Sequence, residues 1–377
     1  MDAPETFYPL RAMVCDECFL TQLSVSVPPD KIFREYAYFS SVSSTWVAHA
    51  RNYAEQMVSK LKLSSGSRVV EVASNDGYLL QQFVELGSEV LGVEPAENVA
   101  AVAEGKGIRC VKQFFSLELA RELVEREGPA NLLVANNVLA HVPEINDFVR
   151  GLAKMLADDG VLTLEFPHLM QLMDKLQFDT IYHEHFSYLS LRVVVKLLAQ
   201  AGLKIFDVDQ LATHGGSLRV FACHNECVPP WDGSVNVQQV LDAEQAFGLN
   251  DLANYRAFGN RIEKTKRSII QFLLSAADEG KKVAGYGAPG KGTTLLHACG
   301  IDSPLLQFTV DKNSYKQGHY MPGTNIEIRD PAAIFAAQPD YLFILPWNLS
   351  DEIMTQMAGI RQWGGKFVLP IPELTIL

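Results

Sequence analysis

"RVVEVASNDGYLLQQFVELGSEVLGVEP", residues 68–95, carries the clearest structural signal in the chain. Residues 68–74 form an apolar run of strand length, residues 75–87 predict a tight turn and a helix that ends at Gly87, and residues 89–95 predict a second strand. This order indicates two parallel strands joined by a crossover helix. Ligands of such sheets bind at the carboxyl ends of the strands, so the turn after the first strand is a candidate site.

The same alternation of strand and helix extends on both sides of this stretch. It predicts helices at 46–63, 96–107, 116–128, 145–160 and 191–202, and strands at 108–111, 130–139, 160–167, 204–211 and 216–224. We therefore expect a Rossmann-like, doubly wound parallel sheet with helices on both faces. A polar stretch at 225–250 breaks the pattern and predicts a domain boundary near residue 248.

A second, smaller Rossmann-like α/β domain is predicted after this boundary. The pattern gives a long helix at 251–280, further helices at 293–300, 330–338 and 349–364, and strands at 281–287, 305–311, 340–346 and 366–370. We therefore expect three parts: 1–35, 36–248 and 249–377.

Composition restricts the partners and the compartment. The chain of 377 residues has a net charge of −12, and no basic stripe of the kind that binds nucleic acid is present. No apolar run is long enough to span a membrane, and the first residues do not resemble a signal peptide. We expect a cytoplasmic protein without a disulfide framework, as a monomer or small homo-oligomer, with a small-molecule substrate.

The turn after the first strand favours one kind of ligand. A dinucleotide would need a G-x-G-x-x-G motif, and this turn has only Gly77. Glu71 in the strand and Glu94, about twenty residues further on, suit a ligand with a positive charge and a ribose diol. S-adenosylmethionine (SAM) has both. The alternative is an ordinary α/β turn with an exposed glutamate.

A second candidate site is "FDTIYHEHFSYLS", residues 178–190, in which Tyr182, His183, Glu184 and His185 are adjacent. In a purely structural interpretation these side chains cap a helix and satisfy one another's hydrogen bonds.

Ten motifs in their order along the chain resemble those of the SAM-dependent sugar C-methyltransferases, which act on nucleotide-linked 4-keto-deoxysugars in antibiotic and surface-polysaccharide pathways. The motifs are "CDECFLTQL", "YAYFSS", "EVASNDGYLL", "GVEPAENV", "NNVLAHVPEINDF", "EFPHL", "IYHEHFSYLS", "HGGSLRVF", "GYGAPGKGTTLL" and "LPWNL". The resemblance covers nearly the whole chain. It implies an N-terminal zinc-binding domain, a class I SAM methyltransferase domain and a C-terminal α/β domain that helps to bind the nucleotide sugar.

The resemblance also implies residue roles. SAM would contact Glu94 and the turn from Ala73 through Asn75 and Asp76 to Gly77, with Glu71 behind it. Asn136 would face the methyl donor and Asn137 the substrate. Tyr182, Glu184, Tyr36 and His141 would surround the substrate.

His185 is the predicted catalytic base. Making the carbon beside a ketone nucleophilic requires a base that removes the α-proton and a group that stabilises the enolate. A histidine with an ordinary pKa of ~6.5 is largely neutral at cellular pH and can accept that proton. The resemblance gives His185 the same role.

The later motif "GYGAPGKG" contains a G-x-G-x-x-G at Gly285, Gly287 and Gly290, which taken alone invites a dehydrogenase interpretation. Asp311 is the only acidic residue near the position expected for ribose binding. Lys291 and the helix N-terminus that follows suit the diphosphate of a nucleotide sugar better. Close packing without a ligand remains the structural alternative.

Cys15 and Cys18 form half of a four-cysteine zinc site, and no other cysteine pair in the chain is spaced to complete it. The resembling family carries its second pair upstream, so we treat residues 1–35 as a remnant of the zinc-binding domain and expect no bound zinc.

We therefore predict an enzyme that uses SAM to methylate the carbon α to the 4-keto group of a nucleotide-linked, expected dTDP-linked, deoxysugar. The alternatives are a methyltransferase for another ketone or a hydroxyl, and an NAD(P)-dependent sugar oxidoreductase that uses the second glycine loop.

Overall fold

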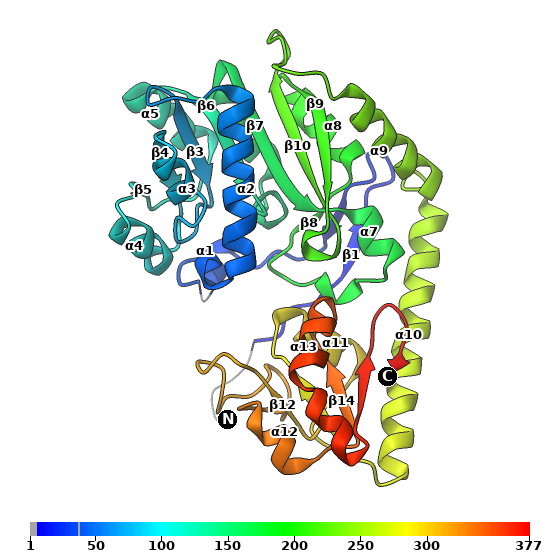
Figure 1. Ribbon diagram of the computed structural model, residues 1–377. Helices are drawn as coiled ribbons and strands as arrows, with labels where there is room; N and C mark the ends of the chain where they lie inside the picture. Colours follow the sequence, from blue (N-terminus) through cyan, green and yellow to red (C-terminus); the bar gives the residue numbers. More distant parts are fainter. Residues whose placement is uncertain (1–5, 37) are drawn as a thin grey trace. The chain divides into compact units, whose positions relative to one another are not determined.

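The computed structural model describes residues 6–36 and 38–377 (Figure 1). The chain divides into two compact units. The large unit consists of Arg11–Leu169 and His183–Asn250, and the small unit consists of the residues up to Leu10, Met170–Tyr182 and Asp251–Leu377.

A seven-stranded sheet forms the centre of the large unit. Its strands, in spatial order, are β5 (Cys110–Val111), β4 (Glu89–Val93), β3 (Arg68–Val72), β6 (Ala130–Asn136), β7 (Leu156–Pro167), β10 (Ser217–His224) and β9 (Leu203–Leu211). Strands β3 to β7 are parallel, and β10 is antiparallel to both of its neighbours. The sheet is therefore mixed where the sequence predicted a parallel one.

Helices cover both faces of this sheet, as predicted. They are α2 (Ser44–Leu61), α3 (Leu80–Glu85), α4 (Glu97–Gly105), α5 (Leu117–Glu127), α6 (Ile145–Met155), α8 (Leu191–Gln200) and α9 (Ser234–Phe247). On one face, α2 and α3 pack against Val69, Leu132 and Phe221 (Figure 1). On the other face, α5, α6 and α8 pack against Val70 and Leu133. Burial of these two apolar layers is the main source of stability.

The N-terminal residues add a separate three-stranded sheet to the large unit. It consists of β1 (Ala12–Val14), β2 (Thr21–Leu23) and β8 (Ser187–Tyr188), in that order. Thr21 pairs with Tyr188 and Gln22 with Ser187. The N-terminal segment is thus hydrogen-bonded to the strand that directly follows the motif "YHEHF".

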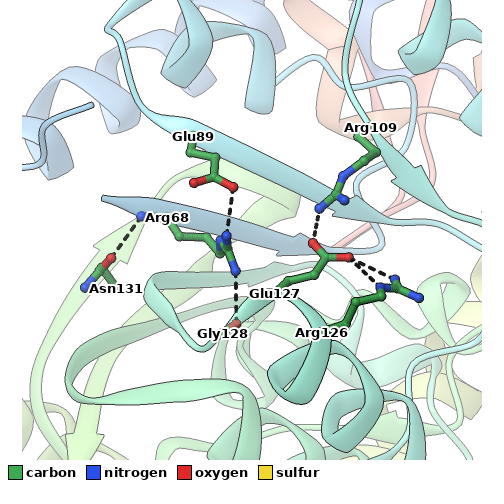
Figure 2. Close-up of polar contacts among 7 residues, drawn as sticks. All are labelled: Arg68, Glu89, Arg109, Arg126, Glu127, Gly128 and Asn131. Atoms are coloured by element: carbon green, nitrogen blue, oxygen red, sulfur yellow. Dashed lines mark hydrogen bonds and ion pairs between the residues drawn. The ribbon is translucent and has the colours of Figure 1, made fainter. Parts of the chain in front are cut away.

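Polar contacts join the amino ends of the parallel strands (Figure 2). Arg68 at the start of β3 donates to Glu89 at the start of β4 over 2.8 Å and to the Gly128 carbonyl over 3.3 Å. Glu127 accepts hydrogen bonds from Arg109 and Arg126. These contacts lie at the edge of the sheet opposite the carboxyl ends, so we interpret them as structural.

The small unit has its own six-stranded sheet. The strand order is β13 (Glu327–Arg329), β12 (Phe308–Val310), β11 (Val283–Tyr286), β14 (Tyr341–Ile344), β15 (Lys366–Leu369) and β16 (Thr375–Ile376). Its helices are α10 (Leu252–Asp278), α11 (Gly290–Cys299), α12 (Ala332–Ala337) and α13 (Ser350–Gln356). Leu176 and Phe178 pack into its core beside Leu295 and Phe343. The segment 170–182 therefore belongs to this unit although it lies far away in sequence.

The remaining helical elements are short. They are α1 (Pro29–Phe33), α7 (Leu169–Asp174) and the 3₁₀ turns at Ser40–Val42, Leu139–His141, Phe178–Thr180, Thr213–Gly215, Trp347–Leu349 and Ala358–Trp363. In the described part of the chain, no helix has the length and apolar character needed to cross a bilayer.

One prediction of secondary structure is wrong, and one helix was not predicted. Residues 156–160, predicted as helix, are the first part of β7, because Leu156 pairs with Ala130 and is buried. The polar stretch 225–250 contains helix α9, whose Glu244 is buried and accepts hydrogen bonds from the backbone of Leu191 and Arg192. Tertiary pairing and capping decide both cases, and neither is visible in the local pattern.

Candidate active site

The turn at residues 73–77 connects β3 to α3 through left-handed backbone. Ala73, Asn75 and Gly77 have φ angles of 59°, 50° and 74°. At Gly77 a Cβ atom would lie 2.4 Å from Ile108 Cδ1. Glycine is therefore required at position 77 both by conformation and by the close approach of Ile108, in the loop between α4 and β5.

Gly77→Ala is expected to lower the free energy of unfolding of the large unit by about 2 kcal/mol or more, through backbone strain and overpacking. Gly66→Ala is the matched control, because nothing lies within 4 Å of its added Cβ. Urea denaturation of both variants checks the prediction, and an equal stability of the two would contradict this account of the turn.

Glu94 fixes the turn from the end of β4. Its Oε2 accepts the Asn75 N–H over 2.9 Å and its Oε1 accepts the Ala96 N–H over 2.9 Å. Burial raises the pKa of Glu94, and these two backbone hydrogen bonds oppose the rise. Glu94 is buried, but each carboxylate oxygen has a second lone pair, so it could accept from hydroxyl groups of a ligand.

Buried acceptor atoms gather at the carboxyl edge of the sheet. Within the described residues, Glu71 Oε2, Asp76 Oδ1, Asn136 Oδ1 and Asn137 Oδ1 have no hydrogen-bond partner. Burial raises the pKa of Glu71 well above its ordinary value, and the charges of Glu94 and Asp76 raise it further. An acidic edge with unpaired acceptors fits a cationic ligand rich in donors, as SAM is with its ammonium, sulfonium and ribose hydroxyls.

Asn75 and Asp76, predicted to bind SAM, also bind the backbone of residues 38–41. The Asn75 amide accepts the Ser40 N–H over 2.9 Å and donates to the Tyr38 carbonyl over 3.1 Å. Asp76 Oδ2 accepts the Ser41 N–H over 3.2 Å. These side chains thus hold residues 38–41 against the 73–77 turn.

Four of the five predicted catalytic residues lie together, and we call Tyr36, His141, Glu184 and His185 the histidine cluster. The rings of His141 and His185 meet edge to face with centroids 4.8 Å apart. Tyr36 Oη donates to Glu184 Oε2 over 3.2 Å. The fifth residue, Tyr182, is the last residue of segment 170–182 and belongs to the small unit.

Two pKa values in the cluster are displaced. Burial lowers the pKa of His141 to about 3, and the neighbouring His185 lowers it as well. His141 is therefore neutral at any physiological pH. Burial raises the pKa of Glu184, and the hydrogen bond from Tyr36 opposes that rise.

Sequence analysis did not single out an aromatic group beside the turn. Trp46 stacks on His49 at 5.0 Å, meets His214 edge to face at 5.3 Å and lies 6.3 Å from Tyr78. His214 has a φ of 52° and lowers the pKa of His141 electrostatically. The signal was present in the motif "HGGSLRVF", in which a histidine precedes two glycines between strands.

Glu165 at the end of β7 was also missed. It accepts hydrogen bonds from Arg219, from Thr213 Oγ1 over 3.1 Å and from His49 over 3.3 Å. Burial acts to raise its pKa, but His49 and Arg219 outweigh burial, so its pKa is lowered. An acidic residue at a strand's carboxyl end was the available signal.

In the small unit, the second glycine loop follows β11. Gly287 has a φ of 90°, and its Cβ would lie 2.5 Å from Pro346 Cδ. The Asp311 carboxylate accepts the Ala288 N–H over 2.8 Å. The acid that a dinucleotide would need for its ribose is therefore engaged with the loop itself.

Lys291, at the N-terminus of α11, has several neighbours. Its amino group donates to Asn348 Oδ1 and lies 4.0 Å from the centroid of the Trp347 ring. Trp347 Nε1 donates to the buried Asp179 over 2.7 Å. Burial lowers the pKa of Lys291 to about 8, against the opposing charge of Asp179, whose own pKa burial raises to about 6.

Cys15 and Cys18 lie in the turn between β1 and β2. Phe19, with a φ of 64°, donates its N–H to the Cys15 carbonyl over 3.0 Å. Backbone N–H groups of Cys18 and Glu17 lower the pKa of Cys15. No group of three or more histidine, cysteine or acidic residues that could hold a metal occurs among the described residues. The two cysteines do not by themselves fit a closed four-ligand zinc site.

The sheet order, the glutamate-fixed turn after β3 and the acceptor atoms at its carboxyl edge define the class I SAM-dependent methyltransferases. Family models match the chain as "Methyltransferase domain" over residues 46–208, "C-methyltransferase C-terminal domain" over 212–372 and a zinc binding domain over 1–33. C-methyltransferase NovU of Streptomyces niveus is 36% identical over 373 residues, which cover 99% of this chain and 88% of that protein. The chain belongs to this C-methyltransferase family.

More distant similarities concern parts of the chain. A ubiquinone biosynthesis O-methyltransferase of Bradyrhizobium sp. is 25% identical over 34% of this chain and 60% of that protein. Magnesium protoporphyrin IX methyltransferase of Synechocystis PCC 6803 superposes with a TM-score of 0.36 at 18% identity, over 48% of this chain and 82% of that one. A SAM-dependent methyltransferase of Archaeoglobus fulgidus gives 0.38 at 15% identity, over 46% and 93%.

The predicted class I methyltransferase fold and methyltransferase activity are confirmed by the family matches. SAM is the methyl donor of this class.

Proposed function

We propose that this enzyme transfers a methyl group from SAM to the carbon α to the 4-keto group of a nucleotide-linked deoxysugar. The observation that carries the proposal is the packing of a neutral His141 against His185, beside the Tyr36–Glu184 hydrogen bond and just after the carboxyl end of β6. A base next to neutral hydrogen-bonding groups is what enolate formation requires. The relationship to a protein named as a C-methyltransferase supports transfer to carbon.

In this proposal His185 takes the proton from the α-carbon, and the electron pair of the broken C–H bond moves toward the keto oxygen. His141 remains neutral, so its imidazole can donate a hydrogen bond to the developing oxyanion without first losing a proton. The Tyr36 hydroxyl donates its single proton to Glu184, so it orients that carboxylate, which can accept a hydrogen bond from a sugar hydroxyl.

Bound SAM supplies an electrophilic methyl group on a sulfonium. We assign its binding to Glu94 and the 73–77 turn, with Glu71 and Asn136 as further acceptors, while Asn137 faces the sugar. The protein accelerates transfer chiefly by holding donor and nucleophilic carbon in line. The resulting bond joins the methyl group to the α-carbon.

We assign the nucleotide diphosphate to Gly287, Lys291 and the N-terminus of α11, because a cation and unpaired N–H groups attract phosphate. Tyr182, from the same unit, is assigned to the sugar. We infer a dTDP-linked sugar and no nucleic-acid or membrane partner.

Lys291 makes the affinity for the diphosphate pH-dependent. Since its pKa is about 8 and Asp179, with a pKa of about 6, is already ionised at neutral pH, raising the pH from 7 to 9 removes mainly the lysine charge. We expect dTDP to bind roughly tenfold more weakly at pH 9 than at pH 7. Calorimetric titration measures this.

Lys291→Ala should bind dTDP weakly at both pH values. Lys281→Ala, an exposed lysine that pairs with Asp340 in the same unit, is the matched control and should retain the wild-type dependence. A wild-type pH profile in the Lys291 variant would remove this residue from the diphosphate site.

Product analysis tests the function itself. The purified enzyme is incubated with SAM and a panel of dTDP-linked 4-keto sugars in D₂O. We expect a product that has gained one methyl group on carbon, and exchange of the α-hydrogen with solvent. A methylated hydroxyl without exchange would support the alternative acceptor, and turnover with NADH instead of SAM would contradict the proposal.

A further inference from the structure

One segment of the large unit, which we call the strap, connects the 73–77 turn to the histidine cluster. It consists of Tyr36 and residues 38–43. Its only regular structure is the 3₁₀ turn at Ser40–Val42, and within it only Ser40 is buried. The strap is therefore held in place largely by polar contacts with other elements.

Asn98 in α4 makes two of these contacts. Its Oδ1 accepts the Tyr36 N–H over 3.1 Å, and its Nδ2 donates to the Tyr36 carbonyl over 2.8 Å. One side chain thus satisfies both peptide groups of Tyr36. Asn98 is four residues after Glu94, on the helix that begins where the Glu94 carboxylate accepts the Ala96 N–H.

Other contacts of the strap also reach the methyl-donor side. Asn75 binds the backbone of Tyr38 and Ser40, and Asp76 binds the backbone of Ser41. Each of these contacts ends either on the 73–77 turn assigned to SAM or on α4, the helix that follows Glu94. The position of the strap therefore depends on the order of that turn.

The other end of the strap is in the histidine cluster. Tyr36 donates to Glu184 over 3.2 Å, its ring lies 5.7 Å from Phe33, and Phe33 lies 5.6 Å from the His141 ring. A shift of the Tyr36 backbone would move the phenol away from Glu184. Tyr36 is thus held at its backbone by Asn98 and at its hydroxyl by Glu184.

We propose that Asn98 is a positioning residue that holds Tyr36 against Glu184, and that the strap makes occupancy of the methyl-donor and acceptor sites interdependent. Ordering the 73–77 turn by a donor orders the strap, which completes the acceptor site. By linkage, each ligand then tightens the binding of the other by the same factor. The second half of this inference rests on the function proposed above.

The first experiment does not require knowledge of the acceptor. Hydrogen exchange of residues 34–43 is followed in the full chain with and without S-adenosylhomocysteine. We expect the ligand to slow exchange in wild type, and to do so much less in Asn98→Ala although the ligand still saturates the protein. Asn52→Ala, an exposed asparagine on α2, should behave as wild type.

Equal protection of the strap in Asn98→Ala and wild type at saturation would overturn the positioning role. Asn98→Asp is the intermediate case, because a carboxylate retains the acceptor for the Tyr36 N–H and loses the donor to its carbonyl. Its protection should fall between those of wild type and Asn98→Ala.

The second experiment measures the coupling. The Kd of dTDP-glucose, a non-reacting sugar nucleotide, is determined with and without saturating S-adenosylhomocysteine. We expect at least fivefold tightening in wild type and a factor near one in Asn98→Ala. Binding without tightening in wild type would overturn interdependence. If dTDP-glucose does not bind wild type at all while the strap is protected through Asn98, the proposed function fails and the positioning role stands.

Discussion

His185→Ala is expected to lower kcat/KM for methyl transfer by about a thousandfold, within the range that loss of a general base produces. The variant should still bind SAM, because neither Glu94 nor the 73–77 turn contacts position 185 in any interaction described above. Solvent exchange at the α-carbon should fall together with transfer, since both begin with the same proton abstraction. Exchange followed by NMR in D₂O, together with initial rates, measures both.

His183→Ala is the matched control for this variant. The two histidines flank Glu184, but only His185 packs edge to face against His141 in the contacts described. We expect His183→Ala to reduce activity by less than about tenfold. Wild-type exchange in His185→Ala would assign the base role to another residue, whereas loss of transfer with exchange retained would give His185 a role in the methylation step only.

His141→Asn is expected to lower the rate of methyl transfer without changing how that rate depends on pH. Since burial and His185 hold the pKa of His141 to about 3, its titration does not contribute to the activity profile between pH 5 and 9. An acidic limb in that interval therefore comes from a group other than His141.

The sequence was sufficient to predict the first half of the large unit. Strand β3, the turn with Gly77 and strand β4 ending before Glu94 are local features, because buried strands are continuous apolar runs and the turn needs glycine at one position. The approximate spacing between Glu71 and Glu94 reflects one strand, one helix and one strand. These are the parts in which local propensity and tertiary structure agree.

The rest required contacts between distant residues. The antiparallel insertion of β10 between β7 and β9 depends on pairing partners such as Ser217 with Pro167, which no local pattern specifies. Residues 156–160 directly follow the helical pattern of residues 145–155 and become strand because Leu156 pairs with Ala130. The motif "GVEPAENV" drew attention to Glu94 and its neighbours but gave no reason to connect Asn98 with Tyr36, sixty-two residues away.

The predicted residues of the histidine cluster came from the resemblance, and their proximity depends on two loops. Phe186 donates its N–H to the Ala140 carbonyl over 2.7 Å, which joins the loop after β6 to the loop before β8. His141 and His185 are thereby neighbours although 44 residues separate them. The local sequence around His141 does not indicate a contact with His185. Reasoning from the residues alone therefore predicted only His185, as the base.

Glu94→Ala is expected to weaken SAM binding by about a hundredfold. Two hydrogen bonds from ribose hydroxyls to a carboxylate, worth together roughly 3 kcal/mol, would be lost. The Asn75 and Ala96 N–H groups would also lose their acceptor, which loosens the turn. Calorimetry with S-adenosylhomocysteine measures the affinity, and a small change in unfolding temperature shows that the fold persists.

The choice of substitution distinguishes the two effects. Glu94→Gln retains one acceptor oxygen but loses the charge, so we expect an intermediate affinity and a less disturbed turn. Glu97→Ala removes an exposed carboxylate in the first turn of α4. It is the control for general electrostatic attraction of a cationic ligand and should change affinity by less than about threefold.

If Glu94→Ala and Glu97→Ala bind alike, the ligand does not contact Glu94, and the carboxylate serves only to fix the backbone of the turn. If Glu94→Gln binds as weakly as the alanine variant, the charge rather than the acceptor geometry holds the ribose, because both variants lack the charge and only one lacks the oxygen.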